Sequence, residues 1–138
     1  MANYNELLVS ARDVDTLASL VDDRRRNDRF EAEAADALAD VLMDARTVPH
    51  DRLPADRVSM NSRVAYREEP GGEPRTVALV HPNEAAPSHG RISVLSPVGR
   101  ALLGRRAGSV ASLSVPGGRA LTIRVLEVER AHSVEEAR

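Results

Sequence analysis

Three carboxylates near the first third of the chain are spaced closely enough to suggest metal chemistry. They lie in the run Asp22-Asp23-Arg24-Arg25-Arg26-Asn27-Asp28, and their oxygens are ligands that hard divalent cations prefer. The three arginines between them compete with any cation, so we expect a solvated charged segment and no metal site. The same charges could instead select a protein partner, because surface charge patterns favour one partner over others.

The remaining residues with chemical potential exclude several classes of enzyme. Histidine occurs at positions 50, 81, 89 and 132, and no pair has a common zinc-ligand spacing. Cysteine and lysine are absent, which excludes disulfides, thiolate metal sites, a Walker A lysine and Schiff-base chemistry. We therefore expect no catalytic residue, no metal and no cofactor.

The segment 91–104, RISVLSPVGRALLG, has the pattern of a strand, a turn and a short helix. Ser96 can cap a helix that has Pro97 in its first position, and Gly104 can end it. An exposed Pro97 would offer a rigid apolar surface. Two leucines, at positions 102 and 103, precede Gly104. We expect them to belong to the core, although one of the two could face outward. The three arginines on or beside the helix, at positions 100, 105 and 106, could pair with a partner's carboxylates or remain solvated.

Two helices are predicted ahead of this motif, in residues 10–46. Ser10 and Asp13 resemble a capping box, with Asp in place of the usual Glu. A first apolar stripe runs through Val14, Leu17, Ala18 and Val21, and the charged run beginning at Asp22 breaks it. A second stripe runs through Phe30, Ala34, Ala37, Leu38, Val41 and Ala45. The short connection predicts an antiparallel hairpin, and about three turns of first helix make it roughly 20 Å long.

The period changes to two from Val58 onward, which indicates strands. Residues 47–57, with two prolines, read as a linker. Strands are expected at 58–66, 76–81, 110–115 and 121–128, with a possible bulge near Leu126. The predicted division is a hairpin at 1–46, a linker at 47–57, a sheet domain at 58–131 and a polar tail at 132–138. The fold class is α+β, with a mostly antiparallel sheet and one short helix.

Charge is divided unevenly between these parts. Residues 1–46 hold 11 acidic residues and 6 arginines, a net charge of −5, whereas residues 47–138 hold 10 and 13, a net charge of +3. A DNA-binding module is usually basic overall, so we expect a protein partner and no direct DNA binding. No signal segment and no apolar run of about 20 residues is visible, and we expect a soluble, cytoplasmic, monomeric protein.

Four segments resemble the bacterial Gre transcript-cleavage factors and, more closely, the regulators of nucleoside diphosphate kinase. They begin with VSMNSRVAY at 58–66 and TVALVHPNEA at 76–85, and continue with 92–104 and with PGG at 116–118 followed by VLEV at 125–128. Their order and spacing make the set specific. One departure is Ser109, where relatives usually carry an acidic residue.

The resemblance implies an FKBP-like sheet domain and binding to RNA polymerase at the rim of its secondary channel. It also implies that the loop Ser96-Pro97-Val98-Gly99-Arg100 contacts the polymerase. Gre factors carry a much longer hairpin, which brings acidic residues to the catalytic magnesium. The short hairpin here predicts competition with Gre-type factors and no cleavage activity.

Two alternatives remain open: an active Gre-like cleavage factor, and a regulator of nucleotide metabolism that acts on another partner. Prolyl isomerase activity, which an FKBP-like fold suggests, is disfavoured because such enzymes use several pocket aromatics. Tyr66 is the only aromatic residue in the sequence of the predicted sheet domain.

Overall fold

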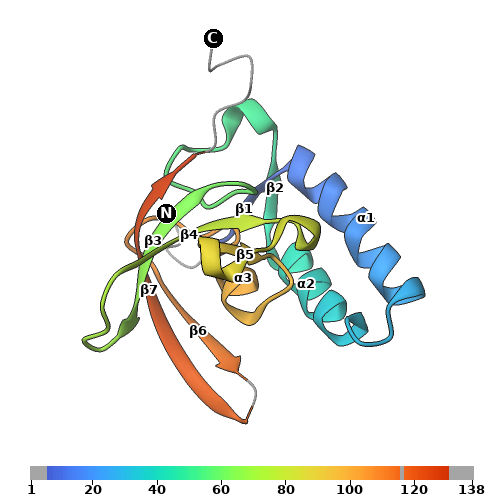
Figure 1. The fold of residues 1–138 in the computed structure, drawn as a ribbon. Coiled ribbons are helices and arrows are strands. Elements are labelled where there is room, and N and C mark those ends of the chain that lie inside the picture. Colours follow the sequence, from blue (N-terminus) through green and yellow to red (C-terminus); the bar gives the residue numbers. More distant parts are fainter. Residues whose placement is uncertain (1–5, 116, 131–138) are drawn as a thin grey trace.

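The computed structural model describes residues 6–115 and 117–130, and it shows a helical pair beside a curled sheet (Figure 1). Three-residue 3₁₀ turns lie at His50–Arg52, after the second strand, and at Pro82–Glu84 and Pro87–His89, within the connection between the fourth and fifth strands. In chain order the helices and strands are β1 (Leu8–Ser10), α1 (Ala11–Asn27), α2 (Ala32–Asp44), β2 (Arg46–Val48), β3 (Arg63–Glu69), β4 (Arg75–Val80), β5 (Arg91–Ser93), α3 (Pro97–Leu102), β6 (Val110–Val115) and β7 (Arg119–Glu129).

Helix α1 begins as predicted but extends farther. The Ser10 hydroxyl oxygen accepts a hydrogen bond from the Asp13 amide at 3.1 Å. The Asp13 carboxylate does not complete the capping box by accepting a hydrogen bond from the Ser10 amide. It accepts one from the Met60 amide at 3.0 Å instead, which connects α1 to the segment before β3. The helix includes most of the charged run and spans about 25 Å at 1.5 Å per residue. Three arginines in its last turn favour this extension, since cations stabilise a helix C-terminus.

Two expected apolar positions in the hairpin were wrong. Ala18 is exposed, and Leu20 joins Leu17 and Val21 on the buried face. Phe30 is 96% exposed instead of opening the second stripe. It precedes Glu31, the N-cap of α2, so it lies on the connecting turn and outside the helical periodicity.

The five-stranded sheet has the order β5-β4-β3-β7-β6. Its pairs are antiparallel except β4 with β5, which are parallel. The predicted bulge is present: Tyr66 pairs with Val125 and Ala65 pairs with Glu127, so Leu126 has no partner in the register. An α+β fold with a mostly antiparallel sheet is thus confirmed.

A second, two-stranded sheet was missed from the sequence. β1 and β2 pair in parallel, with Leu8 opposite Arg46 and Ser10 opposite Val48. These strands bracket the helical pair and bring its two ends together. The expected linker therefore contains part of a strand, and it also holds two buried side chains, Leu53 and Arg57.

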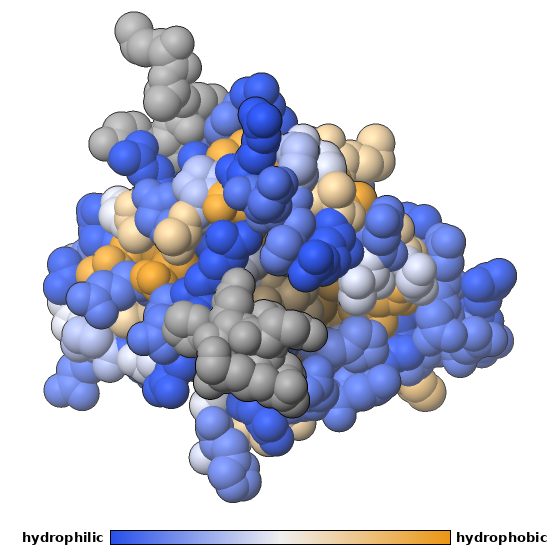
Figure 2. Space-filling model, turned by 90° about the horizontal axis from the view of Figure 1, so that it is seen from above, coloured by the Kyte–Doolittle hydropathy of each residue, from blue (hydrophilic) through white to orange (hydrophobic). Residues whose placement is uncertain are grey.

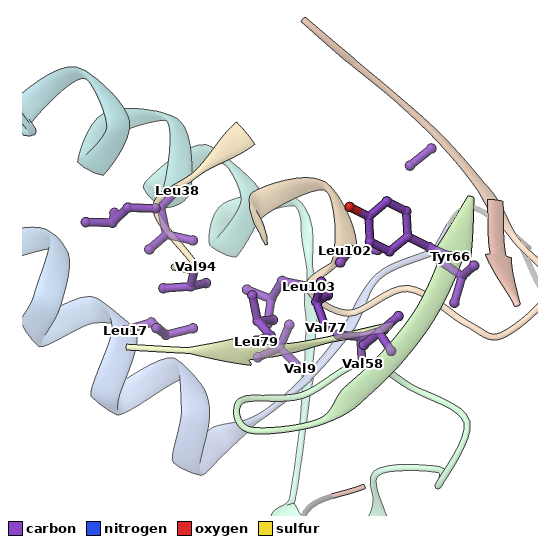
Figure 3. Close-up of a cluster of buried hydrophobic side chains, with 14 of the residues drawn as sticks. Val9, Leu17, Leu38, Val58, Tyr66, Val77, Leu79, Val94, Leu102 and Leu103 are labelled. Atoms are coloured by element: carbon purple, nitrogen blue, oxygen red, sulfur yellow. The ribbon is translucent and has the colours of Figure 1, made fainter. Parts of the chain in front are cut away.

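One buried cluster joins the helices to the sheet. In Figure 3, Leu17 and Leu38 point from α1 and α2 toward Val94, and Leu102 and Leu103 lie between them and the sheet residues. Both leucines before Gly104 are fully buried. Leu103 caps α3 with extended backbone angles, so its side chain leaves the helical direction and also reaches the core. The division at residues 46 and 58 stays a prediction about which parts fold separately.

No described helix combines the length and apolar character that a membrane span requires.

Candidate protein-binding site

The turn that leads into α3 is fixed by hydrogen bonds among three serine and glycine positions. The Ser96 hydroxyl accepts from the Gly99 amide at 3.1 Å and donates to the Ser93 carbonyl at 2.7 Å. The Ser93 hydroxyl accepts from the Leu95 amide at 2.9 Å. Ser96 therefore has the capping role that the sequence predicted, and both functions of its hydroxyl are already used inside the protein.

Pro97 and Val98, the next two residues, form the accessible part of this turn. Both are half-buried, and Val98 also packs against the core cluster. Proline in the first helical turn costs no hydrogen bond and keeps the backbone rigid. These two side chains can supply a small preformed apolar surface to a partner.

Gly99 has no side chain and is buried, so it contributes no accessible surface to the turn. A Cβ at this position would lie 2.1 Å from the Ser93 carbonyl oxygen. Its role within the predicted set is to let α3 approach the end of β5.

Arg100 is partly committed to the same turn, because its guanidinium donates to the Leu95 carbonyl. Burial lowers the pKa of Arg100, and the charge of Glu33 on α2 raises it. Burial also lowers the pKa of Arg105, which donates to the Ala101 carbonyl at 3.1 Å. Both arginines remain cations near neutral pH, so the α3 surface is positively charged, and the charge of Arg100 acts on Glu33 of the acidic helix α2.

The C-terminal end of α3 is joined to the base of the helical pair. The Gly104 carbonyl accepts from the Leu8 amide at 3.2 Å and from the Arg57 guanidinium at 3.2 Å. Arg57 also donates to the Glu6 carbonyl at 2.5 Å. An added Cβ on Gly104 would lie 3.2 to 3.3 Å from atoms of Leu7, Leu8 and Val9. These contacts fix the helical pair at one angle to the α3 surface.

Sequence reasoning missed Arg57 as a structural residue. It is 8% exposed, and burial lowers its pKa. Its partners are backbone carbonyls 47 and 51 residues away, and no local pattern marks such contacts.

The charged run at the far end of the hairpin is largely paired within the hairpin. Arg24 bonds Asp23 at 2.6 Å and Glu31 at 3.0 Å, and Arg25 bonds Asp36 across the helical pair at 2.5 Å. The side chain of Asn27, and then that of Arg24, lower the pKa of Asp23 by hydrogen bonding to its carboxylate.

The last turn of α1 and the connecting turn are also stabilised locally. The Asp28 carboxylate accepts from the Phe30 amide at 3.0 Å and from the Glu31 amide at 3.1 Å. Arg26 lies on the exposed side and donates to the Asp22 carbonyl. The predicted tip residues are therefore brought together, but most of them hold the hairpin end in shape.

Two open grooves accompany these features. One, of about 370 Å³, lies between α1 and the loop after β4 and is lined by Thr16, Ser19, Leu20, Asp23, Arg24, His81 and Asn83. The other, of about 730 Å³, lies on the outer face of β3 and β7. Within the described residues, no three His, Cys, Asp or Glu side chains are grouped to hold a metal.

The helical pair beside a curled sheet, with the capped turn of α3 accessible, can be compared with known proteins. The family model "Transcription elongation factor, GreA/GreB, C-term" matches residues 53–130. The chain belongs to this family, whose members are regulators or elongation factors and not classical enzymes.

Individual relatives agree with this assignment. The chain is 43% identical over 95 residues to the "Regulator of nucleoside diphosphate kinase" of Escherichia coli (strain K12), covering 69% of this chain and 70% of the relative. It is 45% identical over 69 residues to the transcription elongation factor GreA of Desulfovibrio desulfuricans, covering 50% and 43%.

A solved structure is also similar over most of the chain. The match is the prokaryotic transcription elongation factor GreA/GreB from Nitrosomonas europaea, with a TM-score of 0.70, 33% identity, and coverage of 91% of this chain and 98% of that one. The predicted family resemblance is confirmed.

Proposed function

We propose that this protein binds RNA polymerase at the rim of the secondary channel and competes there with Gre-type factors, without stimulating transcript cleavage. The similarity to the E. coli regulator covers about equal shares of both chains, whereas the matched segment is only 43% of the D. desulfuricans GreA. The share of the relative that is covered supports the comparison with the E. coli regulator, and the proposed absence of cleavage rests on the hairpin end.

The proposed docking surface is the turn at Ser96-Pro97-Val98, with Gly99 and Arg100 holding its shape. It combines a half-buried apolar pair with cations at positions 100 and 105. An apolar centre beside charged groups is the usual composition of a protein–protein interface. The FKBP-like assignment of the sheet domain is part of this proposal and carries no isomerase activity.

The proposal that the protein does not stimulate cleavage is supported by one observation: most carboxylates at the end of the hairpin are already hydrogen-bonded within it. Asp23, Asp28 and Glu31 accept hydrogen bonds from Arg24, Asn27 and backbone amides of the hairpin itself, and of the predicted tip carboxylates only Asp22 has no such partner among the described residues. A carboxylate must present free oxygens at about 2.0–2.1 Å to bind Mg²⁺. The hydrogen-bonded side chains would have to give up their present partners to do so, in a hairpin of only about 25 Å.

The test uses purified core RNA polymerase, a backtracked elongation complex and a Gre factor. We expect the protein to bind the polymerase, to reduce Gre-stimulated cleavage as its concentration rises, and to release no shortened 3′ RNA by itself. Cleavage that depends on this protein and disappears with Asp22, Asp23 and Asp28 replaced by Asn would overturn the proposal in favour of an active cleavage factor.

The name of the E. coli relative supports a second candidate, control of nucleoside diphosphate kinase through another partner. Capture from a lysate with the tagged full chain separates the two. Recovery of a nucleoside diphosphate kinase without polymerase subunits favours this second function.

A further inference from the structure

Phe30 is the most exposed large apolar side chain in the described structure, at 96%. It is also the only phenylalanine in a chain whose aromatic content is 2%. Tyr66, by contrast, is buried in the core. Isolated surface apolar residues are ordinary, so its exposure needs a second observation before it indicates binding.

That observation is the failure of Phe30 to pack where its position allows packing. Glu31 is the N-cap of α2, so Phe30 precedes the cap and Ala35 is the fourth helical residue. A large apolar residue before the cap commonly packs on that fourth residue as a hydrophobic staple. Here Phe30 remains almost fully exposed while Ala35 is buried by other groups.

The turn that carries Phe30 is rigidly held. The Asp28 carboxylate accepts from the Phe30 and Glu31 amides, and the Asp28 amide donates to the Arg24 carbonyl at 3.0 Å. Arg24 then links Asp23 to Glu31 across the turn. A side chain on such a preorganised turn loses little backbone freedom on binding.

The charges around Phe30 indicate what its partner looks like. The acidic side chains of the turn point into it as hydrogen-bond acceptors. Arg29 is exposed and has no ion-pair partner among the described residues, and exposed Arg26 donates to a carbonyl. Arg29 therefore presents a positive charge directly beside Phe30, whereas the charge of Arg26 is offset by the neighbouring carboxylates of Asp22 and Asp23. Figure 2 shows a mainly hydrophilic surface on the helical side of the molecule.

We propose that Phe30 is a second anchor, which inserts into an apolar pocket rimmed by carboxylates on the protein partner. The partner is the polymerase of the proposed function, on which this inference rests. The α3 turn supplies the first contact, and the hydrogen bonds at Gly104 join the end of α3 to the base of the hairpin that carries Phe30.

The experiment measures association and dissociation rates of the full chain with purified core RNA polymerase. Aromatic anchors act mainly on dissociation, so Phe30→Ala should raise the dissociation rate about tenfold or more. Phe30→Leu should recover part of the loss. Arg29→Glu should lower the association rate and reduce its dependence on salt, because rim charges steer encounter. The matched control is Met43→Ala, which removes the other exposed apolar side chain of the hairpin, at 83%, and should change neither rate.

Thermal unfolding of Phe30→Ala should match that of the wild type, since the ring contacts little of the protein. If the wild type binds and Phe30→Ala dissociates at the same rate, or Met43→Ala has an equal effect, the anchor is disproved while the proposed function stands. If the wild type does not bind, the proposed function fails with it. Concentration-dependent self-association of the wild type that Phe30→Ala abolishes would overturn the inference by assigning Phe30 to a second copy.

Discussion

Gly99 packs so closely on Ser93 that an added Cβ would lie 2.1 Å from the Ser93 carbonyl oxygen. Glycine in a helix ordinarily costs about 1 kcal/mol relative to alanine. At Gly99 the close approach makes glycine more favourable than alanine. The nearest atom is a backbone carbonyl oxygen of strand β5, which cannot move aside as a flexible side chain could.

Gly99→Ala should therefore destabilise the protein by about 1–3 kcal/mol, the range for overpacking, and displace the α3 turn. Urea unfolding gives the free energy. The matched control is Gly71→Ala, where an added Cβ meets nothing within 4 Å and φ is +81°. It should show only the cost of left-handed backbone, about 1 kcal/mol. A stabilised Gly99→Ala would contradict the packing.

The accessible proline of the α3 turn is expected to contribute to polymerase binding. Pro97→Ala should leave the Ser96 cap intact and weaken binding several-fold, since rigid apolar contacts at an interface centre carry much of the affinity. Pro87→Ala is the matched control, because Pro87 is exposed and begins a 3₁₀ turn, as Pro97 begins the helix α3. Equal affinity for both variants and the wild type would place the docking surface elsewhere.

Removal of the buried Arg57 guanidinium should loosen the base of the hairpin. Arg57→Met leaves two carbonyls with fewer donors, at Glu6 and Gly104. An unsatisfied buried polar group costs about 1–3 kcal/mol. Arg52→Met, an exposed change of the same size, should alter the free energy of unfolding by less than about 0.5 kcal/mol. Faster hydrogen exchange at the Leu8 amide in Arg57→Met alone would confirm the local effect.

The Glu69–Arg124 pair should make stability depend on pH in acid. The Arg124 Nε lies 2.6 Å from a Glu69 carboxylate oxygen and lowers the Glu69 pKa from its ordinary value of 4.5, and Arg67 adds a smaller effect in the same direction. The folded protein thus favours the ionised carboxylate. The resulting stability is complete above pH 4.5 and is lost as the pH falls through the folded-state pKa.

Titration by NMR should show Arg124→Gln raising the Glu69 pKa more than Arg67→Gln does. Glu69→Gln should make the acid limb of the stability profile shallower. Because the pair is accessible to solvent, added salt should reduce the effect. Equal pKa shifts in the two arginine variants would contradict the assignment to Arg124.

The shared core predicts that the helices and the sheet unfold together. Leu38 lies on α2 and is fully buried in the cluster that also contains Val94 and Leu102. Leu38→Ala should lower the free energy of unfolding by about 2–5 kcal/mol. Unfolding is followed by far-ultraviolet circular dichroism of the helices and by the near-ultraviolet signal of Tyr66 in a Tyr4→Phe background. Both signals should shift to the same lower midpoint. Separate midpoints would favour the sequence-based division into hairpin and sheet domains.

Local patterns in the sequence determined the elements that depend on neighbouring residues. Ser96, Pro97 and Gly104 specified the capped turn and its end, and the alternation in 121–128 indicated the bulge at Leu126. The family resemblance followed from the same segments. Caps, turns and strand periodicity are visible in sequence because their causes lie within a few residues.

Only the tertiary structure decided how these elements meet. Three examples are the pairing of β1 with β2, the contacts of Arg57, and the approach of Gly99 to Ser93. In each case, whether the groups meet depends on how the elements pack in the folded protein. The exposure of Phe30 was also decided there, because starting α2 two residues later moved the ring off the apolar stripe. Such outcomes depend on packing between distant segments, which a one-dimensional periodicity does not contain.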